Sequence, residues 1–231
     1  MRIFIGVDPR DVVSYNVLRW SIERRARKPV SVVPLIRFQL PITRTGLTEF
    51  TYTRYAVPML SGFRGRAVFM DSDMLCLADI RELLETPMEG PVAVVKHEER
   101  FEWPSLMLFD CGRCRKLTAD YINDPESRPQ TFEWADKVDS LDSRWNHVIG
   151  YNAPRDDAWI VHYTAGTPGF KELRGCEYSA EWLAERDHMN YQDSWLAIHG
   201  NSVHRKMVEG CIERRVYGGN HDQGYAGNST R

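Results

Sequence analysis

Residues 66–80 read RAVFMDSDMLCLADI, and this stretch decides the fold that we expect for the chain. The apolar run 67–70 follows Gly65 and is typical of a buried strand, and two carboxylates, Asp71 and Asp73, come next. Residues two apart on an extended chain point the same way, so both carboxylates can face one spot. At the carboxyl end of a buried parallel strand, that spot is the crevice where open α/β sheets hold ligands. A divalent cation carrying phosphates would relieve the repulsion between the two acids.

The same three residues have a second interpretation. Asp-Ser-Asp is a common surface turn, and Asp or Ser readily caps the helix that follows. The motif by itself therefore leaves a metal site and a simple turn open, and the rest of the chain has to decide between them.

Composition narrows the class of protein. The chain has 231 residues, enough for one large domain or two small ones, and 42% hydrophobic residues with 7 Trp indicate a folded protein. A net charge of -2 gives no electrostatic case for binding nucleic acid or an anionic membrane surface. The apolar start at residues 3–7 is too short for a signal peptide, and no stretch is long enough for a transmembrane segment.

Cysteine usage favours a reducing compartment. The 5 cysteines are an odd number without regular spacing, so we expect a cytoplasmic protein rather than a disulfide scaffold. Cys111 and Cys114 have the spacing of a redox or zinc half-site. Because the chain has no second such pair and no thioredoxin-like context, we predict free thiols.

The N-terminal third predicts the opening of a doubly wound α/β unit. We expect strands at 2–7 and 30–36, the second near an edge because of Pro34, and between them a helix capped by Asp11 that runs to about residue 25. Val13, Val17 and Trp20 are expected on one face of this helix. Asp8 ends the first strand, either as a simple turn former or on the same rim as Asp71.

Three later segments add polar groups near predicted strand ends. Arg54 lies in an amphipathic segment, residues 50–60, from which it could reach a diphosphate or a carboxylate. Asp110 ends a strand predicted at 105–110, and His162 ends another within 157–162. His162 is either a core histidine or a third ligand, and Gly166 beyond it would let backbone N–H groups approach a phosphate. The loop-rich residues 123–140 suit an acceptor-side wall.

Four motifs occur together in this order: residues 54–55 (RY), 69–75 (FMDSDML), 141–146 (LDSRWN) and 160–170 (IVHYTAGTPGF). This set resembles the GT-A glycosyltransferases over about residues 1–170, most closely the glycogenin and bacterial galactosyltransferase-like family, glycosyltransferase family eight. The resemblance implies an α/β, GT-A type Rossmann-like fold with a mixed, mostly parallel sheet flanked by helices. We expect a catalytic domain over 1–175, a helical C-terminal extension over 176–216 packed on it, and a mobile tail over 217–231.

Carried over position by position, the resemblance implies a site. Asp71, Asp73 and His162 correspond to its metal ligands, and Asp71, Asp73, Arg54 and Asp110 are the implied catalytic residues. The implied nucleotide-sugar-binding residues are Gly6, Val7, Asp8, Arg54, Ser72, Trp145, Asn146, Gly166 and Lys171. Lys171 is included because residues 168–170 (PGF) stand where the family often has Lys-Pro-Trp.

The implied activity is a metal-dependent hexosyltransferase that moves a sugar from a UDP-sugar, of the UDP-glucose or UDP-galactose type, to an acceptor hydroxyl with retention. The acceptor would be a glycan, a lipid-linked glycan or a protein. Two carboxylates and an imidazole suit Mn²⁺ better than Mg²⁺, which stays possible, because imidazole is the softer ligand.

Two other functions stay open. A haloacid-dehalogenase-like phosphatase also has Asp-x-Asp after an apolar strand, although here Leu75 replaces the usual Thr or Val and the later acidic element is missing. A non-catalytic module that binds nucleotides or glycans is the other, because the family's diphosphate lysine is displaced and aromatic residues, which stack on sugars, are frequent.

Overall fold

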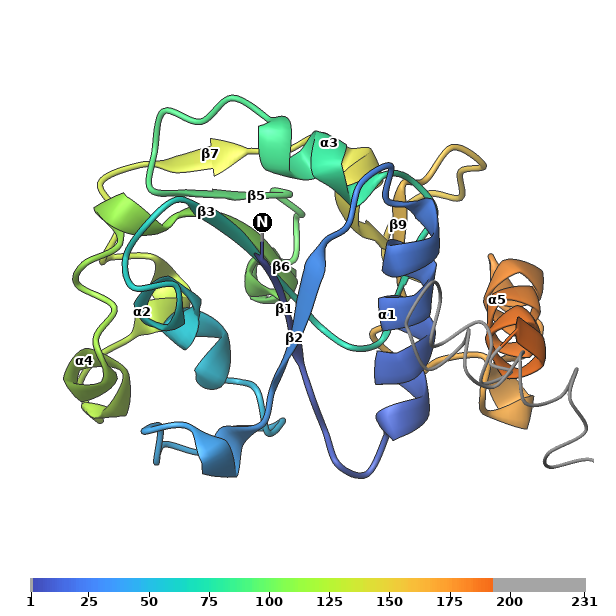
Figure 1. Ribbon diagram of the computed structural model, residues 1–231, viewed down its shortest axis with the longest axis horizontal. Helices are drawn as coiled ribbons and strands as arrows, with labels where there is room; N and C mark the ends of the chain where they lie inside the picture. The colour runs from blue at the N-terminus through green and yellow to red at the C-terminus, as the bar shows by residue number, and fades with distance from the viewer. Residues whose placement is uncertain (1, 193–231) are drawn as a thin grey trace, which may run out of the picture. The chain divides into compact units, whose positions relative to one another are not determined.

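The computed structural model describes residues 2–192 and shows an α/β arrangement (Figure 1). Its strands are β1 (Arg2–Gly6), β2 (Ser31–Leu35), β3 (Arg66–Met70), β4 (Met74–Cys76), β5 (Val92–Val94), β6 (Leu106–Asp110), β7 (Val138–Ser140), β8 (His147–Val148) and β9 (Ile160–His162). Its α-helices are α1 (Val12–Arg25), α2 (Val57–Leu60), α3 (Ile80–Glu85), α4 (Ala119–Asn123) and α5 (Ser179–Gln192). Short 3₁₀ turns complete the framework, among them η2 (Thr53–Ala56), η3 (Arg100–Ser105), η6 (Ser143–Asn146) and η7 (Lys171–Leu173).

Six strands form the central sheet in the order β2-β1-β3-β6-β5-β7. Neighbours pair in parallel except at β6, which runs antiparallel to both β3 and β5. The expected mixed, mostly parallel sheet flanked by helices is confirmed. Pro34 lies in β2 at the edge of the sheet, where its missing N–H leaves no ladder position empty.

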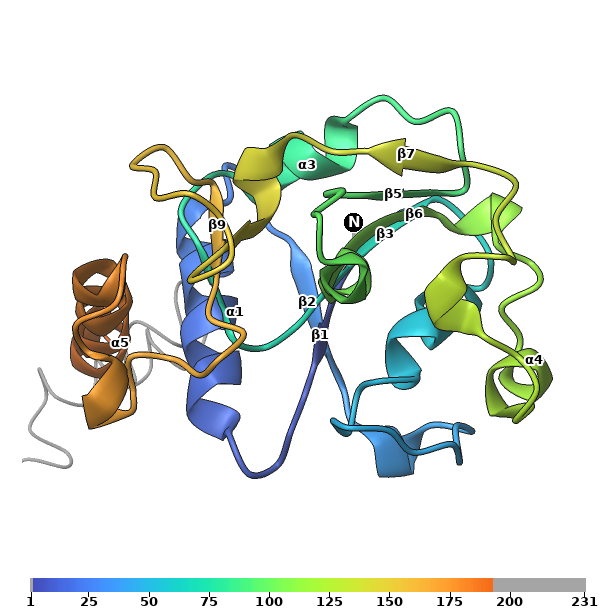
Figure 2. The ribbon, with the colours of Figure 1, turned by 180° about the vertical axis from the view of Figure 1, so that it is seen from behind.

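Alternating side chains of the strands fill two apolar layers, one on each face of the sheet. Phe4 and Phe69 point to the layer that contains α2 and α4, whereas Ile5 and Val68 point to the layer that contains α1 and α3. Figures 1 and 2 show these two pairs of helices on opposite sides of the sheet. The period-2 pattern of buried strands thus holds the sheet between helices.

A second sheet of three strands, β4-β9-β8, continues from the end of β3. Its strand β4 pairs antiparallel with β9, and Met74 lies opposite His162. The strand β8 pairs in parallel with β9 on its other side. This small sheet brings residues 160–162 next to residues 74–76.

Helix α1 begins and ends as predicted, but its buried face differs. The Asp11 side chain accepts a hydrogen bond from the Ser14 backbone N–H and caps the helix. Val17 is buried, whereas Val13 is 48% exposed, so the prediction that Val13 belongs to the inner face is wrong. Small hydroxyls at Ser14 and Ser21 take inward positions that an apolar pattern does not reveal.

Residues up to Arg186 form one compact unit. The predicted helical extension over 176–216 is described only as far as Gln192, where α5 ends, and the predicted tail over 217–231 lies outside the described residues. Within residues 2–192, no helix combines the length and apolar character that crossing a membrane requires.

Candidate functional site

Asp71 and Asp73 follow β3 at the carboxyl end of the parallel strands, as the sequence predicts. The Asp71 backbone N–H donates to the Ser105 carbonyl at 2.9 Å, and the Tyr163 N–H donates to the Asp73 carbonyl at 2.9 Å. The backbone of both acids is therefore anchored to segments far away in the sequence. Such anchoring keeps the two carboxylates at fixed positions.

His162 reaches these acids through the β4–β9 pairing. Because it lies opposite Met74, its ring comes next to Asp73, and its Nε2 is 3.3 Å from Asp73 Oδ1. Single ligand atoms of Asp71, Asp73 and His162 all lie within 4.8 Å of one another. The structure thus brings together the three residues predicted to hold a metal.

Arg54 is the cation of this site. Its Nη2 lies 3.1 Å from Asp71 Oδ1, and its Nε donates to the Phe50 carbonyl at 3.3 Å. The guanidinium also packs over the rings of Phe50 and Phe69, at 5.5 and 5.0 Å from their centroids. Only 8% exposed, Arg54 is held between an apolar wall and the first acid.

Burial perturbs the ionisation of the site. Burial, together with Asp73 and Glu102, raises the pKa of Asp71 to about 7, although the charges of Arg54 and His162 act in the opposite direction. Burial lowers the pKa of His162, but the nearby carboxylates, Asp73 first, raise it above its ordinary value. Shifts of both kinds are typical of ligand-binding and catalytic sites.

The residues fit a divalent metal ion. Asp71 Oδ1 and Asp73 Oδ1 are buried and accept no hydrogen bond from the described residues, although Arg54 and His162 lie at ion-pair distance from them. Buried carboxylate oxygens without hydrogen bonds are costly unless a ligand satisfies them. Two carboxylate oxygens and one imidazole nitrogen form a donor set that suits Mn²⁺ and tolerates Mg²⁺. The buried, unsatisfied oxygens support a cation site over a plain surface turn.

Glu102 also belongs to the site, and the sequence did not indicate it. Its carboxylate is buried, with Oε2 3.4 Å from His162 Nδ1 and Oε1 accepting from Thr164 Oγ1 at 2.9 Å. Glu102 lies in η3, directly before β6. The polar residues 97–100 ahead of a strand were visible in the sequence, but this segment points to the site only once the direction of β6 is known.

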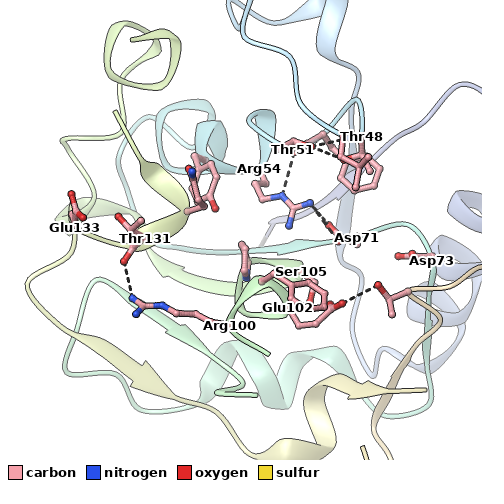
Figure 3. Close-up of a pocket in the computed structure, with 17 residues that line it drawn as sticks. Thr48, Thr51, Arg54, Asp71, Asp73, Arg100, Glu102, Ser105, Thr131 and Glu133 are labelled. Atoms are coloured by element: carbon pink, nitrogen blue, oxygen red, sulfur yellow. Dashed lines mark hydrogen bonds and ion pairs between the residues drawn. The ribbon is translucent and has the colours of Figure 1, made fainter. Parts of the chain in front are cut away.

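Arg54, Asp71, Asp73 and Glu102 line a cavity of about 830 Å³ (Figure 3). Its other lining residues are Leu47, Thr48, Phe50, Thr51, Tyr55, Arg100, Phe101, Pro104, Ser105, Gln130, Thr131, Glu133 and Thr164. Figure 3 shows Thr131 and Glu133 at the far end of the cavity from Asp73. The predicted wall segment, residues 123–140, therefore contributes to the same cavity as the acids. The volume lies in the range of small-molecule sites.

Asp110 does not belong to the site, and its prediction as a catalytic residue near the donor sugar is wrong. It pairs with Arg66 at the start of β3, whereas Asp71 follows Met70 at the other end. The reason is strand direction, because β6 is antiparallel to β3 and its carboxyl end lies at the opposite edge of the sheet. Four residues of strand separate the two edges, about 13 Å.

Trp145 and Asn146 lie behind the cavity rather than in its wall. Trp145 is buried against Trp159 with ring centroids 4.7 Å apart. Asn146 Nδ2 donates to Ser105 Oγ at 2.9 Å, and Ser105 lines the cavity. Neither residue lines the cavity where a donor contact was predicted, and Asn146 instead supports the cavity wall through Ser105.

Three of the residues predicted to bind the nucleotide sugar, Gly6, Val7 and Asp8, lie at the end of β1 and directly after it. A Cβ at Gly6 would lie 2.4 Å from the Phe50 ring, so glycine lets this cavity-lining ring approach the strand. The Val7 N–H donates to the Leu35 carbonyl, and the Asp8 carboxylate accepts from Arg10 at 2.6 Å. None of Gly6, Val7 and Asp8 lines the cavity directly.

The remaining predicted residues are divided between the site and the surface. Ser72 is buried between the two acids. Gly166 has φ of +115°, a conformation that favours glycine, and its N–H is bound to the Tyr163 carbonyl at 2.7 Å. Lys171 is exposed in η7 and does not line the cavity, so its predicted role at a diphosphate has no geometric support.

A curated relative matches most of the chain. Protein CDI of Arabidopsis thaliana is 31% identical over 232 residues, which cover 83% of this chain and 88% of that protein. No protein-family model matches the chain.

Solved glycosyltransferases share the fold. WbbM, described as a bifunctional glycosyltransferase, matches 91% of this chain with a TM-score of 0.66 and 16% identity. GlyE of Streptococcus pneumoniae matches 83% of this chain with a TM-score of 0.60 and 14% identity. An active-site mutant of LgtC matches 81% of this chain with a TM-score of 0.57 and 11% identity. The chain spans 51% of the WbbM chain, 63% of the GlyE chain and 95% of the LgtC chain. The likeness shows a GT-A type fold.

Proposed function

The chain belongs to the family of Protein CDI of Arabidopsis thaliana, and we propose, from its fold and its site, that it is a glycosyltransferase using a nucleotide-sugar donor. One observation carries the proposal: Asp71, Asp73 and His162 converge at the edge of a cavity in a fold shared with glycosyltransferases. Within this class we favour a hexosyltransferase of the family-eight type with a UDP-sugar donor, Mn²⁺ or Mg²⁺, and retention.

The side chains of the cavity suit a diphosphate donor. When bound, a divalent cation would stabilise the negative charge of the departing diphosphate. Arg54 lies 3.1 Å from Asp71, where its charge favours the ionised carboxylate, and it presents guanidinium N–H groups in a fork that matches phosphate oxygens. Thr48 and Thr51, which line the same cavity, add hydroxyl groups for the nucleotide or sugar.

The far end of the cavity is the proposed place of the acceptor, a glycan, a lipid-linked glycan or a protein. Gln130, Thr131 and Glu133 come from the predicted wall segment and offer polar contacts to sugar hydroxyls. Phe101 is 63% exposed and lines the cavity, so its ring offers an apolar surface to the face of a sugar.

A cytoplasmic location completes the proposal. Cys76, Cys111, Cys114 and Cys176 are free thiols, and the first three are buried. Burial raises the pKa of Cys111 and of Cys114, so both remain protonated and are poor nucleophiles. Unreactive thiols of this kind suit a reducing compartment.

A binding module without catalysis is the second candidate, and one observation favours it. The diphosphate lysine expected at Lys171 lies outside the cavity, and Asp110 lies at the wrong edge of the sheet. A donor could therefore bind through the metal ligands and Arg54 without efficient departure of the diphosphate. The phosphatase alternative lacks such support, because the fold matches glycosyltransferases.

Ligand-dependent stability followed by turnover tests the proposal. Thermal unfolding is measured with UDP, GDP and several nucleotide sugars, each with Mn²⁺, with Mg²⁺ and with EDTA. A ligand present at 100 times its dissociation constant adds about 2.7 kcal/mol to the free energy of unfolding. We expect a metal-dependent stabilisation by UDP, and then metal-dependent release of UDP from one UDP-sugar. Binding without release identifies a binding module, and no nucleotide effect would overturn the assignment.

A further inference from the structure

Glu102 is a buried carboxylate in contact with the third metal ligand. It is 2% exposed, and its two oxygens face two different groups. Figure 3 shows Glu102 among the residues that line the cavity. Oε2 lies 3.4 Å from Nδ1 of His162, and Oε1 accepts a hydrogen bond from Thr164 Oγ1 at 2.9 Å. On the other side of the imidazole, Nε2 lies 3.3 Å from Asp73 Oδ1. The His162 ring is therefore placed between Glu102 and the metal-binding acids.

A hydroxyl group alone does not explain a buried carboxylate. Moving an ionised acid out of water is costly unless an opposite charge or several donors compensate it. Among the described residues, no ion pair joins Glu102 to a lysine or an arginine. His162 Nδ1 is buried and forms no hydrogen bond with a described residue, and Glu102 Oε2 is the carboxylate oxygen paired with it at 3.4 Å. Glu102 is thus the acceptor to which an Nδ1–H of the imidazole can donate.

We propose that Glu102 is a positioning residue that holds the His162 imidazole with Nε2 facing the site of a divalent cation. The inference rests on the metal site of the proposed function and names a residue that the three-ligand assignment leaves out. A proton on Nδ1 donates to Glu102, so the Nε2 lone pair is left for the cation. The orientation of the His162 ring and its tautomer are then already set before the cation binds.

The charges of the cluster agree with this role. When the three carboxylates are ionised and His162 is neutral, Asp71, Asp73, Glu102 and Arg54 together carry a charge of −2. A divalent cation cancels this charge. Without Glu102 the loaded cluster would have an excess positive charge in a buried place.

The backbone around Glu102 is held in place by neighbouring groups. Ser105 Oγ donates to the Glu102 carbonyl at 2.6 Å, and the Ser105 carbonyl accepts from the Asp71 N–H at 2.9 Å. The Trp103 indole donates to the His97 carbonyl at 2.8 Å. The turn that contains Glu102 is therefore hydrogen-bonded through Ser105 to the backbone of Asp71, as a positioning role requires.

Cation affinity in the absence of any substrate tests the role directly. Isothermal titration calorimetry with MnCl₂ is carried out on the full chain and on Glu102→Gln, which keeps the shape of the side chain but removes its charge. We expect the Mn²⁺ dissociation constant to rise about 10–100-fold in the variant. Glu185→Gln, which changes another buried glutamate outside the site, is the matched control and should bind Mn²⁺ like the unaltered chain.

Metal preference separates positioning from general loosening of the fold. Imidazole favours Mn²⁺ over Mg²⁺, so a displaced ring should lower Mn²⁺ affinity more than Mg²⁺ affinity. Glu102→Gln and His162→Asn should therefore lose the same preference, and the double variant should lose little more than either one. Equal losses for both metals, or fully additive losses, would contradict the proposal.

The outcomes distinguish this inference from the function on which it rests. If the unaltered chain binds Mn²⁺, Asp73→Asn does not, and Glu102→Gln binds normally, the metal site stands and the role of Glu102 is refuted. If the unaltered chain binds no divalent cation, the metal site and the inference both fail. Should Glu102→Gln fold poorly by circular dichroism, Thr164→Val replaces it and should show a smaller loss of Mn²⁺ affinity with Mg²⁺ affinity kept.

Discussion

Two charged clusters in this protein, one around Glu185 and one around Asp71 and Asp73, differ in how the charge of their buried carboxylates is balanced. Glu185 on α5 is 3% exposed and meets two arginines of α1, Arg24 at 2.9 Å and Arg25 at 2.8 Å. The cluster at the end of β3 instead gathers three acids around one arginine, Arg54, and one histidine. Glu185 of α5 contacts two arginines of α1 that balance its charge, whereas the acids that line the cavity outnumber the basic groups near them.

The difference indicates what each cluster is for. Burial raises the pKa of Glu185, but the hydrogen bonds and charges of Arg24 and Arg25 lower it by more. The pKa of Glu185 therefore lies below its ordinary value, and the ionised carboxylate is favoured. In the cavity burial dominates, and the pKa of Asp71 rises to about 7. A compensated acid stabilises the fold, and uncompensated acids lower its stability until a cation binds.

The largest expected effect concerns turnover. Replacing Asp73 with Asn removes a metal ligand while keeping the shape of the side chain, and we expect metal-dependent release of UDP from the donor to fall by about 10³-fold. The control is Asp110→Asn, the acid at the opposite edge of the sheet, which should release UDP at a near-normal rate. A normal rate of UDP release in Asp73→Asn would show that the cluster at the end of β3 is not needed for the reaction.

Metal-dependent stability should come next in size. Mn²⁺ at 100 times its dissociation constant should raise the free energy of unfolding by about 2.7 kcal/mol, because it binds only the folded cluster. Asp73→Asn should lose this gain, and Glu185→Gln should keep it. Urea unfolding at neutral pH with MnCl₂ and with EDTA measures both; equal gains in all three proteins would place the cation elsewhere.

Without metal, the two clusters should respond to neutralisation with opposite signs. In EDTA, Glu185→Gln should lower the free energy of unfolding by about 2 kcal/mol, since two arginines lose their partner. Asp73→Asn should leave it unchanged or raise it, because a crowded cluster loses one negative charge. Denaturant midpoints compared at one pH decide the matter, and a large destabilisation by Asp73→Asn would show that both clusters are structural.

The smallest effect is a pH dependence of the α5 contact. The pKa of Glu185 in the folded protein lies below the ordinary 4.5, so its stabilising contribution is complete above that value and is lost as pH falls through the folded pKa. The stability difference between the unaltered chain and Glu185→Gln should thus be constant at neutral pH and shrink below about pH 4.5. Chemical unfolding between pH 7 and pH 3.5 measures it, and a difference that stays constant down to the lowest pH would contradict the pairing.

Much of the framework was predictable because its signals are local. The apolar run before Asp71, the cap at Asp11 and the proline at the sheet edge each act through neighbouring residues, and all lie where expected. Asp79 caps α3 in the same local way, because its side chain accepts from the Arg81 N–H. The placement of Val13 was wrong because the inner face of α1 uses serine hydroxyls instead of apolar groups.

Asp110 and Glu102 show where local signals end. Asp110 ends β6 and Glu102 precedes it, and the residue pattern of a strand is the same in either direction, so the pattern alone did not show which end meets Asp71. Only about a dozen residues without an α-helix separate β5 from β6, whereas a parallel connection needs a crossover, so the antiparallel turn was the physical choice. With that direction, the start of β6 faces the cavity, and Glu102 and Ser105 take the place expected for Asp110.

By itself the sequence determined an α/β chain with paired acids after a buried strand and a histidine at the end of another, because side-chain period and capping depend on neighbouring residues. The tertiary structure decided that His162 lies beside Asp73, that Glu102 lies behind His162, and that Lys171 lies outside the cavity. Those positions depend on strand direction and on the register between β4 and β9, which are set by contacts among residues far apart in the chain.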